Sequence, residues 1–309
     1  MLNRIIASIS KFADKLRTSL ARRIILVKFG KGYRHIHPYW PFMKINFKED
    51  GRHEIVFKGK KVYTTKSFKE LKNKKYDEIV VFGAGPSVKQ MDISKVKPET
   101  AILVNGAMAL ANKLKGGPLM CAVFDYAFLW DKNCSKMLDD LPAGTKLLVS
   151  DCFLGYALRK NRHLLDKFDL YLSFSALHPY YKPERKVRQL PKEDFKIGYD
   201  SAFSYNPQKA MFDGGTILTW ALQVAYYLRA DITYICGLDL GNFNEPHFYE
   251  TEKNKIVSVG LLRDYQRIEN FMRLTSETFK EQNLKIYNCS PVTKLPYSIF
   301  PFSEHFIKK

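Results

Sequence analysis

The stretch Glu78-Ile79-Val80-Val81-Phe82-Gly83-Ala84-Gly85-Pro86-Ser87 decides the fold. Its first half is a short apolar run that predicts a buried strand, and its second half is a glycine-rich turn. Similar apolar runs cover residues 101–104, 120–124, 146–150, 232–236 and 285–288, and helical patterns cover residues 217–228 and 263–281. Short apolar strands that alternate with helices are typical of an α/β protein whose mainly parallel sheet is covered on both faces.

Polar residues follow several of these predicted strands at the point where each strand ends. They are Asn105, Asp125, Asp151 and Asp239. The carboxyl ends of parallel strands meet at one edge of the sheet, and ligands of such folds bind beyond that edge. We therefore expect the functional site there.

The N-terminal 28 residues predict a basic amphipathic helix. Apolar residues recur in steps of three and four, at Leu2, Ile5, Ile6, Ile9, Phe12, Leu16 and Leu20, and Asp14 is the first acid of the chain. Such a helix is suited to the surface of an anionic membrane. The alternatives are a helix packed on the protein's own core and a contact between copies of the chain.

Residues 32–75 are aromatic and basic, and alternation over 54–57 and 61–64 predicts a small β element. The sequence thus divides into a membrane-associating appendage, residues 1–75, and an α/β domain, residues 76–309.

The charge balance indicates an anionic partner, because 50 Lys and Arg face 31 Asp and Glu, for a net charge of +19. No RRM, zinc-finger or basic-zipper pattern is present, so we expect no nucleic acid. Five scattered cysteines without a Cys-x-x-Cys pair favour a reducing compartment over a disulfide framework or zinc site. Without a secretory signal or a run of about 20 apolar residues, the sequence predicts a cytosolic protein that touches a membrane only peripherally.

The glycine turn is the first candidate nucleotide site. Gly83 and Gly85 let backbone N–H groups approach an anion, Ser87 adds a hydroxyl, and Pro86 fixes the turn but has no N–H to donate. Val88 replaces the third glycine of a dinucleotide fingerprint, so that motif is incomplete. The alternative is a tight turn without a ligand.

A second candidate is Asp213-Gly214-Gly215-Thr216, directly before the predicted helix over 217–228. Helix N-termini bind phosphate through their unpaired N–H groups and dipole. Thr216 is alternatively a plain N-cap of that helix.

Several segments together resemble a known family. They are Phe82 to Ser87, Thr216 to Leu228 leading to Ile235-Cys236-Gly237-Leu238-Asp239-Leu240, Phe248-Tyr249, and Ile286 to Pro291 with Ile299 to Phe302. In this order they resemble lipopolysaccharide core biosynthesis proteins of the RfaZ (WaaZ) type, which are Kdo transferases. More distantly they resemble the bacterial lipooligosaccharide sialyltransferases of glycosyltransferase family 42. The resemblance spans residues 76–303. It implies that residues 76–309 form a nucleotide-sugar-binding glycosyltransferase domain, and that the protein lies peripherally on the cytoplasmic side of the bacterial inner membrane.

The resemblance implies a GT-A-like Rossmann variant that binds a CMP-sugar donor without metal or other cofactor. It places Gly83, Gly85 and Ser87 closest to the nucleotide, Asn105 and Asp125 near the donor, and Thr216 at the nucleotide-contacting helix start. It also implies that Asp239 borders the cytidine and that Tyr249 steadies the leaving phosphate. Two departures stand out: Ala84 replaces an asparagine of the sialyltransferases, and residues 256–265 lack their catalytic histidine, which leaves His247 as the nearest one.

The mechanism expected from this resemblance is an inverting transfer of Kdo or a sialic acid to a lipopolysaccharide or lipooligosaccharide core. His247 is the candidate base, because the pKa of a histidine lies near cellular pH, and Asp125 is the second choice. Tyr249 and the N–H groups of Gly214 to Thr216 would serve the phosphate, and Lys209 or Arg229 the donor carboxylate. Two alternatives stay open: a non-catalytic peripheral membrane nucleotide-binding protein, and a pterin-diphosphokinase-like enzyme.

Overall fold

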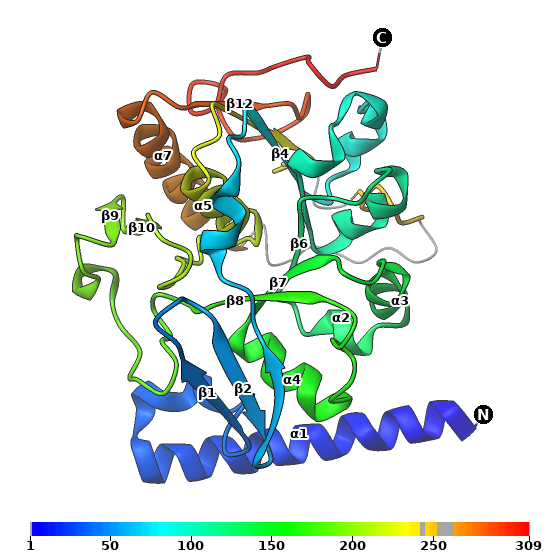
Figure 1. Cartoon of the computed structure of the whole chain (residues 1–309), viewed down its shortest axis with the longest axis vertical. Coiled ribbons are helices and arrows are strands. Elements are labelled where there is room, and N and C mark those ends of the chain that lie inside the picture. Colours follow the sequence, from blue (N-terminus) through cyan, green and yellow to red (C-terminus); the bar gives the residue numbers. More distant parts are fainter. Residues whose placement is uncertain (1, 242–244, 252–262, 309) are drawn as a thin grey trace.

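The computed structural model describes residues 2–241, 245–251 and 263–308, and its centre is a seven-stranded sheet (Figure 1). The strand order is β12-β11-β4-β5-β6-β7-β8, and all neighbouring pairs in this sheet are parallel. The strands are β4 (Glu78–Phe82), β5 (Ala101–Val104), β6 (Met120–Val123), β7 (Lys146–Ser150), β8 (Asp169–Ser173), β11 (Ile232–Cys236) and β12 (Lys285–Asn288). The predicted α/β class with a mainly parallel sheet is confirmed, and β8 is a strand that the sequence analysis did not predict.

Both faces of the sheet are covered, because successive strand residues point to opposite sides. In β5, Leu103 belongs to one hydrophobic core and Ile102 to the other. The Ile102 side is covered by α5 (Leu218–Tyr227) and α7 (Tyr265–Glu281). The Leu103 side is covered by α3 (Lys132–Asp140), α4 (Asp151–Lys160) and the 3₁₀ helix η6 (Asn105–Lys113).

Short 3₁₀ helices, rather than α-helices, connect the first strands. Between β4 and β5 lie η3 (Pro86–Gln90), η4 (Ile93–Lys95) and η5 (Pro98–Thr100). The remaining elements are α2 (Ala127–Trp130), η7 (Val187–Gln189) and an antiparallel hairpin of β9 (Phe195–Gly198) and β10 (Ser201–Ser204).

The N-terminal segment contains the predicted helix and the predicted small sheet. Its elements are α1 (Leu2–Phe29), η1 (Lys31–Ile36), β1 (Met43–Phe47), β2 (His53–Phe57), β3 (Lys60–Thr64) and η2 (Phe68–Asn73), and β1-β2-β3 form an antiparallel sheet. In Figure 1, α1 runs along the bottom of the molecule, beneath β1, β2 and α4. Ile25, Tyr39 and Ile55 are buried in the same core as the Leu103 side of the main sheet. The division at residue 75 stays a prediction.

α1 presents two different faces over the residues whose side chains are described. Ala21 and Ile25 are buried against the protein, which fits the alternative of a helix packed on its own core. Four apolar side chains on another face remain exposed, at Leu16, Leu20, Ile24 and Val27. No helix in the described part of the chain has the length and apolarity to cross a bilayer.

The order of the strands positions the site. The chain passes from β4 outwards through β5, β6, β7 and β8, and then returns to place β11 on the other side of β4. The direction of strand addition therefore reverses between β4 and β11. In open parallel sheets, the crevice beyond the carboxyl ends of two such strands is where ligands bind.

Candidate functional site

The glycine turn after β4 lies at this reversal and packs against the segment that follows β11. The N–H of Gly83 donates to the Cys236 carbonyl at 2.8 Å, and the N–H of Gly85 donates to the Gly237 carbonyl at 3.2 Å. A Cβ on Gly83 would lie 2.6 Å from the Gly237 oxygen. Only glycine allows the two segments to approach this closely.

Ser87 and Asp239 hold the two segments together. The Ser87 N–H donates to Asp239 Oδ2 and the Ser87 hydroxyl donates to Asp239 Oδ1, both at 2.5 Å. Both residues are buried. Burial raises the pKa of the Asp239 carboxyl, and the two hydrogen bonds from Ser87 oppose that shift. The structure thus brings two predicted site residues together, as partners of each other.

The turn uses much of its own hydrogen-bonding capacity within the protein. Besides Gly83, Gly85 and Ser87, the N–H of Val88 is also bonded, to the Gly85 carbonyl. This geometry fits the alternative of a tight turn. It stays a prediction that a nucleotide contacts this turn, at Gly83, Gly85, Pro86 or Ser87.

Residues 245–251 lie over this turn and over the end of β5. The Phe248 N–H donates to the Ala84 carbonyl at 3.2 Å. The Tyr249 ring packs on Gly106, where a Cβ would lie 2.1 Å from a ring carbon, so no other residue fits at Gly106 without moving the tyrosine. Burial raises the pKa of the Tyr249 hydroxyl, which therefore keeps its proton.

Asn105, the residue before Gly106, has features of a ligand-binding side chain. Its backbone adopts the left-handed region, with φ 47°, which is uncommon for residues other than glycine and is enriched at functional sites. Its Oδ1 is buried and has no hydrogen-bond partner among the described residues. A buried polar atom in this state costs free energy until a ligand or water satisfies it.

His247 and Glu250 form a pair beside Tyr249. The imidazole Nδ1 lies 2.9 Å from Glu250 Oε2, and the same carboxylate accepts the His247 backbone N–H at 3.0 Å. The Glu250 side chain is 2% exposed, and the His247 ring stacks on the Tyr249 ring at 5.5 Å with an interplanar angle of 2°. The approach of Nδ1 to the carboxylate is a short charge contact and does not have hydrogen-bond geometry. It places Nε2 as the nitrogen on the other side of the ring, where a histidine exchanges protons with a substrate.

The sequence analysis did not predict a role for Glu250. The signal was present in the spacing of His247-Phe248-Tyr249-Glu250, because two residues three apart in a turn lie close enough for their side chains to meet.

The two remaining strand-end aspartates differ in exposure. Asp125, two residues after the end of β6, is exposed at the edge where a ligand would bind. Asp151 begins α4 and is buried, and the Tyr39 side chain from the N-terminal segment lies close to it. Burial raises the pKa of the Asp151 carboxyl to about 7. Asp125 is therefore the one of these two that can contact a substrate.

The second glycine segment lies at the N-terminal end of α5, next to the first one. Leu218, the first residue of α5, packs within 3.1 Å of where a Cβ on Gly83 would lie. The N–H of Gly214 donates to Thr219 Oγ1 at 3.2 Å, and that of Gly215 donates to Asp213 Oδ1 at 2.9 Å.

Two expectations about this region are wrong. Thr216 is not the N-cap of α5, because the N-cap is Ile217, which has no side-chain cap. Arg229 does not reach the site, because it precedes β11 and so lies at the opposite edge of the sheet, where it bonds Gln282. Lys209, the other candidate for the donor carboxylate, pairs with Asp194 at 2.5 Å.

No cluster of three or more metal-ligating side chains occurs in the described ranges. The metal independence of the site stays a prediction.

Comparison with known proteins gives one curated relative and several solved structures, whereas no family model matches. The relative, from Escherichia coli K12, is 25% identical over 250 residues, covering 75% of this chain and 84% of its own length, and is described as a "probable 3-deoxy-manno-octulosonic acid transferase". This description agrees with the resemblance to Kdo transferases, and the RfaZ type itself stays an expectation.

The solved structures are more distant. The MAf glycosyltransferase of Magnetospirillum magneticum AMB-1 has a TM-score of 0.43 and 14% identity, and the match covers 74% of this chain and only a third (33%) of that protein. The sialyltransferase CstII of Campylobacter jejuni, solved with cytidine-5'-monophosphate, has a TM-score of 0.37 and 14% identity over 77% of this chain and 89% of that protein. Both TM-scores are low, so the fold assignment above rests on the sheet of this protein itself.

Proposed function

We propose that this protein is an inverting, metal-independent glycosyltransferase that moves Kdo, or a sialic acid, from a CMP-sugar to a lipopolysaccharide or lipooligosaccharide core. The observation that carries the proposal is the His247–Glu250 pair. It lies beside Tyr249, whose ring packs on Gly106 at the carboxyl end of β5. The distant relative described as a probable Kdo transferase supports the choice of sugar.

In the proposed reaction an acceptor hydroxyl attacks the anomeric carbon of the donor. The bond from that carbon to the CMP phosphate oxygen breaks, and the phosphate leaves with both bonding electrons. His247 Nε2 takes the proton of the hydroxyl, and the Glu250 carboxylate 2.9 Å from Nδ1 stabilises the imidazolium that forms. The exposed Asp125 is the second candidate for the base.

The leaving phosphate needs hydrogen-bond donors where its charge develops. Tyr249 keeps its proton and is suited to donate one bond. The second source is the backbone N–H groups of Thr216 and Ile217, directly before α5. The N–H groups of Gly214 and Gly215 and those of Thr219 to Ala221 already donate within the protein. The buried Oδ1 of Asn105 would accept a hydrogen bond from the CMP-sugar.

The outer face of α1 supports a peripheral site on the cytoplasmic side of the inner membrane. Its exposed apolar side chains, at Leu16, Leu20, Ile24 and Val27, are spaced so that they form one stripe. Arg23 and Lys28 are exposed on the same helix. An apolar stripe with cations beside it is suited to the head-group region of an anionic bilayer.

The test measures CMP release by the purified full chain with CMP-Kdo or CMP-sialic acid, a truncated lipopolysaccharide acceptor and EDTA. We expect acceptor-dependent release from one donor. His247→Asn should lower the rate by about a hundredfold or more, and Glu250→Gln by about tenfold to a hundredfold, since both act on proton transfer. Neither should change the Kd for CMP.

The control variant is His163→Asn. His163 Nδ1 lies 2.7 Å from Asp166 Oδ2 with the same spacing of three residues, but that pair is exposed. This variant should keep the wild-type rate. CMP binding without release from either donor would favour the non-catalytic alternative, and Mg²⁺-dependent consumption of ATP would favour the diphosphokinase alternative.

A further inference from the structure

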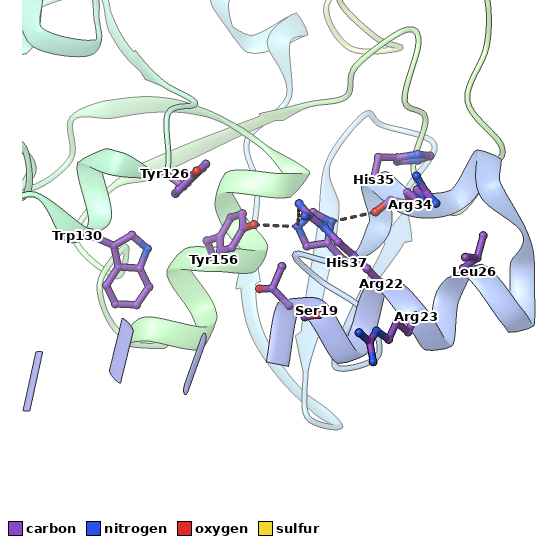
Figure 2. Close-up of a pocket in the computed structure, with 11 residues that line it drawn as sticks. Ser19, Arg22, Arg23, Leu26, Arg34, His35, His37, Tyr126, Trp130 and Tyr156 are labelled. Carbon is purple, nitrogen blue, oxygen red and sulfur yellow. Dashed lines mark hydrogen bonds between the residues drawn. The ribbon is translucent and has the colours of Figure 1, made fainter. Parts of the chain in front are cut away.

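A cavity of about 810 Å³ lies between the N-terminal segment and the main domain, away from the glycine turn (Figure 2). Its walls come from α1 and η1 on one side, and from α4 and the region around α2 on the other. It is lined by Thr18, Ser19, Arg22, Arg23, Leu26, Arg34, His35, His37, Tyr126, Trp130 and Tyr156. The transfer reaction proposed above assigns no role to the residues that line this cavity.

The cavity is strongly cationic. Arg22 and Arg23 of α1 and Arg34 of η1 line it and are exposed, and no Asp or Glu is among the described residues that line it. Guanidinium groups bind phosphate through paired, charge-assisted hydrogen bonds. The wall charges therefore fit a ligand that carries phosphate.

A buried histidine fixes the position of the arginine wall. His37 Nδ1 donates to the Arg34 carbonyl at 2.9 Å, so its Nε2 is the acceptor. Nε2 accepts the Tyr156 hydroxyl at 3.0 Å and the Arg22 guanidinium at 3.2 Å, and Figure 2 shows Tyr156 and His37 pointing toward one another. Burial, reinforced by the charges of Arg22, Arg159 and His35, lowers the pKa of His37 to about 4.

At neutral pH His37 is therefore uncharged and acts as an acceptor that holds two groups from different elements. The hydrogen bonds are made before any ligand arrives, so binding requires little reorganisation of this wall.

The opposite wall is aromatic. The Tyr126 and Tyr156 rings lie 5.1 Å apart, and the Lys160 ammonium lies 5.3 Å from the centre of the Trp130 ring. Tyr126 is 55% exposed, so its ring is accessible to a ligand in the cavity. Aromatic faces pack on the apolar C–H faces of sugar rings, and ligand sites combine such surfaces with a few polar groups.

The cavity lies between α1 and the segment after β6, which carries one residue of the candidate site. Tyr126 directly follows Asp125, the exposed carboxylate beyond β6. On the other side, Arg22 and Arg23 belong to the helix whose outer face carries the apolar stripe.

We propose that this cavity binds a phosphorylated sugar of the acceptor, with Arg22 and Arg34 on the phosphate and Tyr126 and Trp130 on the sugar rings. The statement that this sugar belongs to the acceptor rests on the proposed function. The statement that the cavity binds a phosphorylated saccharide is independent of that function, because it follows from the charges and rings of the cavity.

The experiment titrates the full chain, in low salt and without lipid, with a deacylated phosphorylated core oligosaccharide and with the same oligosaccharide after removal of its phosphates. We expect the phosphorylated form to bind at least about tenfold more tightly, as the loss of charge-assisted bonds predicts. The double variant Arg22→Gln/Arg34→Gln should lose that preference. Tyr126→Ala should weaken both forms severalfold, which gives a second readout if the arginine variant folds poorly.

The matched control is Lys113→Gln/Lys115→Gln, which removes the same charge from exposed positions at the end of η6. It should bind both oligosaccharides as the wild type does. Inorganic phosphate serves as a third probe and should compete only weakly, because it makes no ring contacts.

Two results would overturn the proposal: equal binding of the two oligosaccharides, or equal losses in the arginine and lysine variants. A defect of the arginine variant confined to anionic vesicles, with oligosaccharide binding intact, would also overturn it and assign these cations to bulk lipid. CMP release is measured on the same samples. Arginine-dependent oligosaccharide binding without CMP release would refute the proposed function alone, and release that is indifferent to acceptor phosphate would refute this inference alone.

Discussion

Replacing Asp151 with asparagine is expected to stabilise the protein at neutral and alkaline pH. The carboxyl is 1% exposed, and its Oδ1 accepts the Cys152 N–H at 2.9 Å. Its Oδ2 is buried without a hydrogen-bond partner among the described residues. Burial is the largest cause that raises the pKa of this group from 3.8 to about 7. The folded protein therefore holds a proton that the unfolded chain releases.

The sign and size of the effect follow from this shift. Because the folded state binds more protons between pH 4 and 7, the free energy of unfolding falls as the pH rises through that window. A shift of about three pKa units corresponds to a loss of about 4 kcal/mol at pH 8 relative to pH 4, at about 1.4 kcal/mol per unit. Asparagine cannot ionise, so Asp151→Asn should remove this loss. The free energies of unfolding of the variant and the wild type should therefore be most similar at low pH.

The assay is urea unfolding of the wild type and of Asp151→Asn at pH 5, 6, 7 and 8, with Asp77→Asn as the control for an exposed carboxylate. The advantage of Asp151→Asn should grow from pH 5 to pH 8, and the control should show no such growth. A difference that is the same at pH 5 and pH 8 would refute the assignment of Asp151 as a buried, titrating group.

Three further outcomes are expected. Ser87→Ala removes the 2.5 Å hydrogen bond to buried Asp239 and should lower the free energy of unfolding, measured in urea, by about 1.5–3 kcal/mol. A loss under about 0.5 kcal/mol would show that the Ser87–Asp239 hydrogen bond does not hold the two segments together. Gly106→Ala puts a methyl group into the Tyr249 ring and should slow CMP release by about tenfold or more, so an unchanged rate would separate Tyr249 from catalysis. Val27→Glu, at a side chain 89% exposed, should weaken co-sedimentation with anionic vesicles severalfold without changing the free energy of unfolding; equal co-sedimentation would argue against the membrane face.

Six of the seven strands of the main sheet could be predicted. Five of them are runs of four or five mostly apolar residues that both faces of the sheet bury. β12, an edge strand with only Ile286 and Tyr287 apolar, was predicted from its place after the long amphipathic helix. The seventh, β8, lies at the edge of the sheet, and its apolar part is only Leu170-Tyr171-Leu172, too short for a period to be recognised. The 3₁₀ connections after β4 were not predicted either, since prolines at 86 and 98 set their turns without a helical apolar stripe.

The candidate site was harder to predict, because its partners are far apart in the chain. Ser87 and Asp239 are separated by 152 residues, and nothing in either segment indicates that they bond each other. Asp151 followed a strand just as Asp125 did, yet Asp151 is buried, with Tyr39 of the N-terminal segment close to it, and Asp125 is exposed. Local spacing contained one further signal, the His247–Glu250 pair. The cationic cavity joins residues 18–37 to residues 126–156, which no local pattern connects.

The two faces of α1 have a kinetic consequence. The same helix carries an apolar stripe on one side and a wall of the cationic cavity on another. If the protein is the membrane-bound glycosyltransferase proposed above, it meets its acceptor by diffusion in two dimensions, and its rate should follow the mole fraction of acceptor in the lipid surface. Diluting the acceptor with inert lipid at constant bulk concentration would then slow turnover, whereas a deacylated acceptor would be insensitive to added lipid.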